Sequence, residues 1–511
     1  MRLPFPTRIS VQKTLIFAIV VLIAQLLEKT DPIFSGLFFV YIILSVLAFN
    51  LAGGFSRASG SYVFWFALLT CIVGGLWKVV LGEPGDSNLT APSVTLATYV
   101  VGMAMIIVSL FVSHKATRNT GGFSTLLHAD DINLGLASLG CLLADVFAFY
   151  SLHFLPGGSG TLNSIIVQEN VFLPLAILLG TVYTIRRSGG RRSVNVVTAI
   201  ASVAMFTFGL ISYSKQAMFT PFVCWLVAAA SQRYRLRPGQ LLLLAGFSVY
   251  SVMILSPLSQ VARAIVPDNF DRGQRLELSI DLLSHPLRLR ATYTGMIGAD
   301  VPGQVLPVFA RSYFDTPQGL LDRLTIIKSD DRLVNYTLQG HTDGYQRFIY
   351  YFINWIPHFI LPNKESFAPP GGIAAGNYYA HETGGFLAPE DFTTGISFSP
   401  TAEAFHMEGW VGILLLGPIA WILLFTTVDL ICGDLRRSPF GLIAAVAFAH
   451  VAPESLLGGL VQFVWTGNIA IIIAIAFCAY FAPVLGALLA GSSDSPRPSS
   501  GAANLAPTSG S

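Results

Sequence analysis

The chain has 511 residues, of which 53% are hydrophobic and only 11% are charged, and its formal net charge is +2. Together with a mean hydropathy of +0.63, these values exclude an ordinary soluble enzyme and indicate an all-α polytopic membrane protein. No nucleic-acid-binding signature stands out, so we expect no nucleic-acid partner.

Apolar stretches of about 20 residues recur along the chain, which is the length that a helix needs to cross roughly 30 Å of hydrocarbon. They predict about 12 transmembrane helices, at residues 12–27, 33–52, 61–81, 93–113, 132–155, 166–185, 194–213, 216–232, 240–257, 408–431, 440–457 and 468–490. The first stretch resembles the apolar core of a signal peptide. No clear cleavage site follows it, so we expect it to be retained.

The basic residues of the short loops alternate from one predicted loop to the next. Such residues collect on the cytoplasmic side of a membrane protein. With the N-terminus inside, sixteen of them fall on the cytoplasmic side, and only Lys29, Lys78 and Lys215 fall on the other side. We therefore expect both termini in the cytoplasm.

One long segment between the ninth and tenth spans interrupts this alternation. It carries eleven basic and fifteen acidic residues. We expect short amphipathic helices at 276–293 and 320–339, broken by Pro286 and by polar clusters. The predicted domains are helices 1–9 (residues 1–257), a large outer loop (258–406), helices 10–12 (407–491) and a disordered cytoplasmic tail (492–511).

The cytoplasmic connections are informative because they are short. The longest, at about 114–131, cannot fold a nucleotide-binding domain, and no Walker or Rossmann motif stands out. Any enzyme of this kind therefore acts at the outer face, on substrates in the membrane or beyond it. The sequence indicates no cofactor and no metal site.

The aromatic-rich stretch YQRFIYYFINWIPHFILPNKE, at residues 345–365, is nearly long enough to span a membrane. On a helix, Arg347, Tyr351 and Asn354 form one polar stripe. One interpretation is an interfacial anchor with an arginine that reaches up to the headgroups. The other is a site in which Arg347, His358 and Lys364 face a lipid-linked phosphate.

A second cationic candidate is Lys215 in the stretch SYSKQAMF, directly before the eighth span. That helix is predicted to begin outside, so its exposed amides and positive dipole end, with the lysine beside them, suit an anion. The alternative is an ordinary lysine at a membrane boundary.

The stretch SFSPTAEAFHMEGWVGI leads into the tenth span. Ser399 can cap this helix and Pro400 can take its first position. Glu403 and His406 then share a face, and Glu408 lies well round the helix. These groups either complement the helix dipole and a local hydrogen bond, or serve a glycosyl transfer as a base and an orienting group beside a cationic pocket.

These motifs resemble the outer-loop pattern of bacterial O-antigen and exopolysaccharide repeat-unit polymerases. The matching residues are Pro357, His358, Phe359, Pro362 and Lys364, then Glu403, Phe405, Gly409 and Gly412, with Lys215 before the eighth span. Twelve spans with a large outer loop after the ninth resemble both these polymerases and the related O-antigen ligases. The resemblance covers the architecture of the whole chain but local motifs over only about 80 residues.

The resemblance implies a metal-independent membrane glycosyltransferase with a GT-C-like fold in the bacterial inner membrane, with the loop in the periplasm. It would join oligosaccharide repeat units carried on undecaprenyl diphosphate. Its partners would include membrane lipid, a chain-length regulator and a flippase. The implied catalytic residues are Glu403 and His406, and the diphosphate-binding residues are Lys215, Arg332, Arg347, His358 and Lys364.

One departure from the family pattern and two rival functions remain. An arginine is usual where this chain has His358, so the charge there depends on pH near neutrality. Arg332 is preferred among the other loop arginines because of its nearness to Arg347. An O-antigen ligase would instead pass the glycan to lipid A-core. A secondary transporter would need midplane charges, of which Asp145 is the only convincing one.

Overall fold

The computed structural model describes residues 2–117, 131–154, 171–266, 270–296, 312–316, 318, 320–372, 375–384 and 396–490. In these residues the structure is helical, with no β-strand and one isolated bridge between Arg2 and Arg235. The predicted all-α class is therefore confirmed for the described chain. The tail predicted at 492–511 lies outside the described residues.

The α-helices of the first half are α1 (Val11–Leu27), α2 (Pro32–Leu51), α3 (Ala58–Ala67), α4 (Val73–Leu81), α5 (Pro92–Thr117), α7 (Asp131–Phe154), α9 (Phe172–Arg187), α10 (Val196–Ile211), α11 (Lys215–Ser231) and α12 (Pro238–Tyr250). The following helices, which include most of the predicted loop, are α13 (Ser256–Ile265), α14 (Arg272–Ser284), α15 (Pro286–Met296), α16 (Leu320–Leu324), α17 (Ile327–Leu338), α18 (Gln346–Ile353) and α19 (Gly376–Glu382). The last are α20 (Pro400–Val411), α21 (Gly417–Cys432), α22 (Leu442–Glu454), α23 (Leu457–Gln462), α24 (Asn468–Ala476) and α25 (Ala482–Ala490).

Several of these helices join through single π-helical turns into longer apolar rods. Within the described residues, six rods are long and apolar enough to cross a membrane: Pro32–Leu51, Ala58–Leu81, Pro92–Thr117, Pro238–Ile265, Pro400–Cys432 and Leu457–Leu488. Each of the other six predicted spans overlaps a described helix of 13 to 24 residues. The described chain is that of a helical membrane protein, and the full count of twelve spans stays a prediction.

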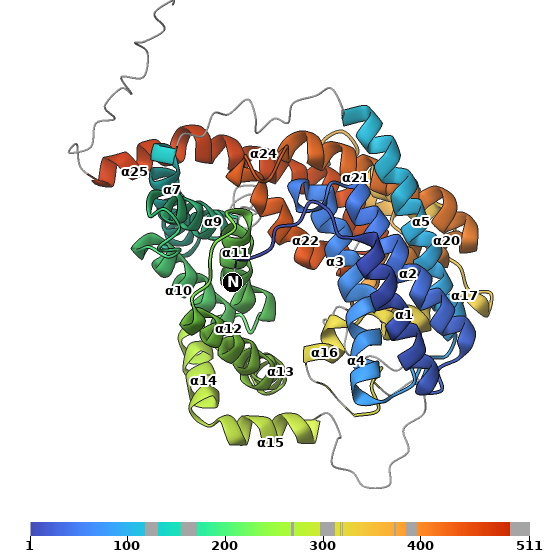
Figure 1. Cartoon of the computed structure of the whole chain (residues 1–511). Coiled ribbons are helices and arrows are strands. Elements are labelled where there is room, and N and C mark those ends of the chain that lie inside the picture. The colour runs from blue at the N-terminus through green and yellow to red at the C-terminus, as the bar shows by residue number, and fades with distance from the viewer. Residues whose placement is uncertain are drawn as a thin grey trace, which may run out of the picture.

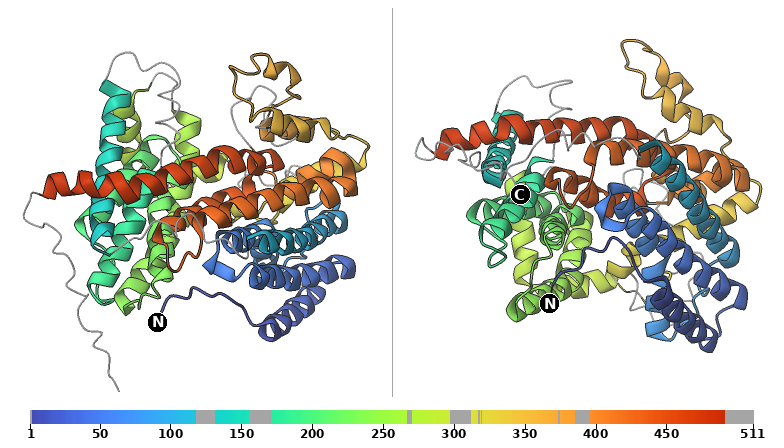
Figure 2. Two further views of the ribbon diagram at one scale, coloured as in Figure 1. Left: turned by 90° about the horizontal axis from the view of Figure 1, so that it is seen from above. Right: turned by 45° about the horizontal axis from the view of Figure 1, so that its top comes forward.

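The helices form two groups that the C-terminal helices connect (Figures 1 and 2). In one group, α2 packs on α1, α3 and α5. In turn, α5 packs on α21, and α3 packs on α21 and α22. In the other, α9 packs on α7, α10 and α11. The rod α24–α25 runs across both groups and ends against α7.

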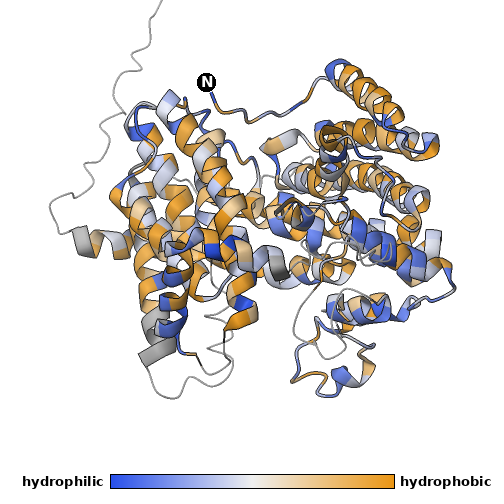
Figure 3. Cartoon of the chain, turned by 90° about the horizontal axis from the view of Figure 1, so that it is seen from below, coloured by the Kyte–Doolittle hydropathy of each residue, from blue (hydrophilic) through white to orange (hydrophobic). Residues whose placement is uncertain are grey.

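Many helices carry exposed apolar side chains. Figure 3 shows that hydrophobic residues, in orange, recur along most of the helices. Leu27, Val196, Leu242 and Leu488 are each about 75% exposed, and α12 has no buried residue at all. Large continuous apolar surfaces are rare on soluble proteins, but lipid solvates them well. These faces therefore fit contact with hydrocarbon.

Loops predicted to share one side of the membrane contact one another. On the predicted inner side, the contacts pair Leu3 with Tyr234, Ser56 with Leu435, and Arg186 with Gln232. On the predicted outer side, they pair Thr30 with Gly85, Asn88 with Asp315, and Tyr213 with Arg263. The grouping agrees with the alternation of basic residues. Which group faces the cytoplasm stays a prediction.

The predicted outer loop holds the expected short helices. The stretch 276–293 forms most of α14 and α15, which are separate because Pro286 begins α15. The stretch 320–339 forms α16 and α17. The ninth span extends further than expected, since the rod Pro238–Ile265 continues eight residues past residue 257.

Candidate functional site

The predicted start of α20 is confirmed. The Ser399 hydroxyl accepts a hydrogen bond from the Ala402 N–H at 3.2 Å, and Pro400 takes the first helical position. A capping oxygen and a residue with a fixed backbone angle that lacks an N–H are what a helix N-terminus favours. Together they fix where the first-turn residue Glu403 points.

Glu403 is completely buried, and three segments donate hydrogen bonds to its carboxylate. The Tyr351 hydroxyl of α18 donates at 2.5 Å and the Tyr379 hydroxyl of α19 at 3.2 Å. The Gly458 N–H in the first turn of α23 donates at 3.3 Å. A buried carboxylate needs such donors because it has lost its water. Glu403 therefore joins two loop helices to the start of the last rod.

Arg347 lies beside this carboxylate and is also fully buried. Its Nε is 2.5 Å from Asp343 Oδ2, and its two Nη atoms donate to the carbonyls of Gly372 at 3.0 Å and Pro370 at 2.7 Å. The guanidinium also stands 5.1 Å from the Tyr379 ring centroid. Burial lowers the pKa of Arg347, but the nearby tyrosines, Asp343 and Glu403 outweigh it and hold the pKa above its usual value. The guanidinium is therefore charged and is held in one position by these contacts.

A kink in α20 positions Asp343. The backbone leaves helical geometry at Glu408 and Gly409, and Gly409 has a φ of +58°, which favours glycine. The freed backbone carbonyls pair with the loop before α18: Asp343 N–H donates to the His406 carbonyl at 3.3 Å and Gly344 N–H to the Met407 carbonyl at 3.0 Å. The side chain of Glu408 also accepts from Tyr345 N–H at 2.9 Å. Asp343 is held against the first turns of α20 in this way.

His406 lies on the same face of α20 as Glu403, as predicted. Its Nδ1 is 2.9 Å from the Thr337 hydroxyl of α17, and its Nε2 is 3.9 Å from Asp343 Oδ1. The Tyr379 ring packs edge-on against the imidazole, with centroids 5.1 Å apart. The polar cluster thus comprises Glu403, His406, Asp343, Arg347 and the tyrosines 351 and 379.

The helix α17 is fixed beneath the cluster by two successive buried aspartates. Asp330 accepts from the Ser399 N–H at 2.8 Å and from the Tyr99 hydroxyl at 2.6 Å. Asp331 accepts from the N–H groups of Thr90 at 2.6 Å and Ala91 at 2.8 Å, which directly precede α5. Each carboxylate therefore complements the N-terminus of a long apolar helix. Neither aspartate belongs to a recognisable motif in the sequence.

The structure does not bring every predicted phosphate ligand to this cluster. Lys364 turns back to the C-terminus of α18 and donates to the carbonyls of Asn354 at 3.1 Å and Ile356 at 3.0 Å. His358 is exposed on the loop beyond α18. Arg332 is buried on α17, where it donates to the Gly384 carbonyl at 2.6 Å. Burial lowers the pKa of Arg332 to about 10.

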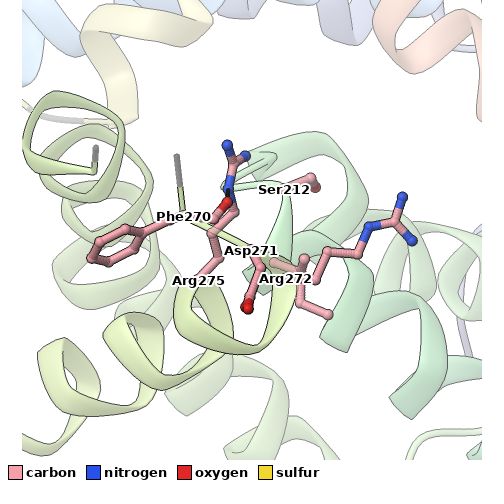
Figure 4. Close-up of a pocket in the computed structure, with 6 residues that line it drawn as sticks. Ser212, Phe270, Asp271, Arg272 and Arg275 are labelled. Atoms are coloured by element: carbon pink, nitrogen blue, oxygen red, sulfur yellow. Dashed lines mark hydrogen bonds between the residues drawn. The ribbon is translucent and has the colours of Figure 1, made fainter. Parts of the chain in front are cut away.

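Lys215 belongs to a second cationic group at the turn between α10 and α11. It donates to Ser256 Oγ at 3.0 Å, and Arg263 donates to the Tyr213 carbonyl at 2.8 Å. A cavity of about 520 Å³ lies beside this turn and is lined by Ser212, Phe270, Asp271, Arg272 and Arg275 (Figure 4). The apolar residues packed there form a core distinct from the one around Tyr379. The predicted single site is therefore two groups.

Two members of the cluster carried no signal in the sequence. Asp343 and Tyr379 lie outside any periodic apolar pattern, and neither belongs to a motif. A count of acidic residues in the loop could have flagged Asp343, which stands four residues before Arg347. Its contact with His406, however, depends on the kink in α20.

The fold and the cluster define an all-helical membrane protein with a buried acidic and cationic site at one end of an apolar rod. In the described residues, no three or more His, Cys, Asp or Glu side chains are arranged to hold a metal ion. Comparison with protein-family models, with curated proteins and with solved structures finds no match for this chain.

Proposed function

We propose that this protein is a membrane glycosyltransferase that polymerises lipid-linked oligosaccharide repeat units at the outer face of a bacterial inner membrane. The growing glycan passes from undecaprenyl diphosphate to the next lipid-linked unit. The observation that carries this proposal is the meeting of Glu403, His406 and Arg347 at one end of the rod Pro400–Cys432. All three residues were candidates from the sequence alone, before their proximity in the fold was known.

The chemistry of the cluster suits a transfer from a diphosphate. The leaving group gains negative charge as the glycosidic bond breaks, and a fixed guanidinium stabilises that charge. Two of the present partners of Arg347 are neutral carbonyls on the segment around Gly371 and Gly372. Diphosphate oxygens bind a guanidinium more strongly than carbonyls do, so the substrate can displace this segment.

The acceptor needs a base for its hydroxyl. Asp343 is the more reachable candidate because its side chain retains 15% exposure, and His406, itself only 3% exposed, has its Nε2 3.9 Å from Asp343 Oδ1. Glu403 is enclosed by Tyr351, Tyr379 and α23. We assign Glu403 to holding the two tyrosines and α23 in place. His406 takes the role of base.

The test is polymerisation by the purified protein in lipid nanodiscs, supplied with a short-chain polyprenyl-diphosphate-linked repeat unit. We expect a ladder of products from the wild type. We expect at least about 100-fold slower extension from His406→Gln and Arg347→Lys. The control is Asp281→Asn, because Asp281 is an exposed carboxylate on α14 that pairs only with His285 in the described residues.

Other outcomes identify the rivals. Transfer of one glycan to a lipid A-core acceptor without a ladder would replace the polymerase by an O-antigen ligase. Solute movement across vesicles with neither transfer would favour a transporter. Full activity of Lys215→Ala would show that the cationic group at the start of α11 takes no part in the reaction. A loss of activity would indicate that this group contributes to substrate binding.

A further inference from the structure

His406 and Asp343 face each other across a gap whose hydrogen-bonding character follows from their other partners. The Thr337 hydroxyl donates its proton to the Leu333 carbonyl at 2.8 Å. It can then only accept from the imidazole, 2.9 Å away, so Nδ1 of a neutral His406 carries the proton. Nε2 is left with a lone pair, directed to the side where Asp343 lies.

The Asp343 side of the gap is also an acceptor. Oδ2 lies 2.5 Å from the Arg347 Nε, and it shares the single hydroxyl proton of Tyr379, at 2.8 Å, with Glu403 Oε1, at 3.2 Å. Oδ1 faces His406 Nε2 at 3.9 Å, too far for a direct hydrogen bond. A hydroxyl carries one proton, so the hydroxyl of an acceptor sugar can donate to Nε2 at about 2.8 Å, the usual length of such a bond, and makes no second donation to Oδ1.

The gap lies at the edge of the cluster, beside an aromatic surface. The Tyr336 ring stacks on His341 with centroids 4.2 Å apart, and it lies 5.9 Å from the His406 ring. His341 is exposed and Tyr336 is half-buried. Flat aromatic faces pack well against the C–H faces of sugar rings. Both kinds of face are apolar, and the aromatic face carries the negative part of the ring quadrupole, which attracts the C–H groups.

We propose that the attacking hydroxyl of the acceptor sugar donates its proton to His406 Nε2, on the side where Asp343 Oδ1 lies, and that the sugar ring packs on the outer face of His341, whose other face stacks on Tyr336. This inference rests on the proposed function and deepens it. In the step, the hydroxyl proton moves to His406 Nε2, and the hydroxyl oxygen bonds to the anomeric carbon of the donor glycan. The bond from that carbon to the diphosphate breaks, with its electron pair on the diphosphate oxygen.

Asp343 and Thr337 have different parts in this step. Asp343 Oδ1 lies beside the imidazolium that forms when His406 accepts the proton, so its charge favours the transfer. Thr337 is a positioning residue, because it acts only through the tautomer of His406. The proton then leaves His406 to solvent, which restores the neutral imidazole for the next addition.

The experiment measures kcat and the acceptor KM for chain extension, with the same nanodiscs and repeat unit. Asp343→Asn should lower kcat by about 100-fold and change the acceptor KM much less, since the amide keeps the shape but not the charge. Thr337→Val keeps the shape but removes the acceptor of the Nδ1 proton, so kcat should fall at least about tenfold. Thr337→Ser keeps the hydroxyl, so its kcat should be close to that of the wild type.

The outcomes separate this inference from the proposed function. Absence of a product ladder from the wild type would refute the proposed function. A wild-type ladder with Thr337→Val as active as Thr337→Ser would overturn the inference alone. The two Thr337 variants also test the inference if Asp343→Asn fails to fold. Thr337 is buried, and valine has a similar shape, so Thr337→Val is expected to keep the fold. A rise in acceptor KM at constant kcat in Asp343→Asn would likewise overturn the catalytic role.

Discussion

Asp330 makes the stability of the loop domain depend on pH in a direction that can be stated in advance. Burial raises the pKa of its carboxyl from 3.8 to about 6, although hydrogen bonds from Ser399 and Tyr99 oppose the rise and the charge of Asp331 adds to it. This difference corresponds to about 3 kcal/mol between the neutral and charged forms.

A carboxyl whose pKa is higher in the folded chain favours folding while it is protonated. The contribution of Asp330 is therefore fully present below pH 3.8 and is lost as the pH rises through about 6. Asp330→Asn stays neutral and keeps an oxygen for the Ser399 N–H. We expect this variant to match the wild type near pH 4 and to exceed its unfolding free energy by about 3 kcal/mol at pH 8.

The measurement is the thermal unfolding midpoint in detergent, followed by tryptophan fluorescence from pH 4 to pH 8. One kcal/mol moves the midpoint of chains of 150–250 residues by about 2–4 °C, so the expected gain at pH 8 is several degrees. Asp281→Asn, on an exposed face of α14, should show no such trend. An Asp330→Asn midpoint that differs from the wild type by the same amount at pH 4 and pH 8 would refute the reasoning, because the ionisation of the carboxyl would then not change the stability of the fold.

Three further substitutions test the packing around the cluster. Asp331→Ala removes the carboxylate that accepts two N–H groups at the start of α5; we expect a loss of about 2–4 kcal/mol in thermal unfolding, and an unchanged midpoint would contradict this. Gly412→Ala places a methyl group 1.8 Å from the Ala404 carbonyl oxygen, so the kink must shift, and we expect a lower midpoint together with at least about tenfold slower chain extension. Tyr351→Phe removes the shortest hydrogen bond to Glu403; we expect a loss of about 1–3 kcal/mol and faster hydrogen exchange in α18, and exchange at the wild-type rate would argue against the contact.

Local sequence signals are sufficient to predict the helices and the site residues that lie within them. Ser399 and Pro400 mark the start of α20 because capping is decided within one turn. The spacing of Glu403 and His406, and of Arg347 and Tyr351, places each pair on one helix face. Such patterns need no knowledge of the tertiary fold, so they could be read from the chain.

The convergence of charges could not be predicted in the same way. Lys364 was expected at a phosphate, but its nearest acceptors are the carbonyls that end α18, a common partner for a lysine at a helix C-terminus. Lys215 joins the core at α10, α11 and α13 instead. A cation in a sequence has no preferred acceptor until the fold provides one, so its sign alone does not assign it to a site.

The contacts of Glu403 make the loop and the last rod a single energetic unit. Its oxygens take donors from α18, α19 and the start of α23, and water does not reach any of them. Removing one donor leaves a buried carboxylate short of hydrogen bonds, which costs more than the net value of the lost bond. A movement that displaces α18 or α19 must therefore bring a new donor to Glu403 or release α23. Because Tyr379 also holds Asp343, the same movement changes the distance between Asp343 and His406.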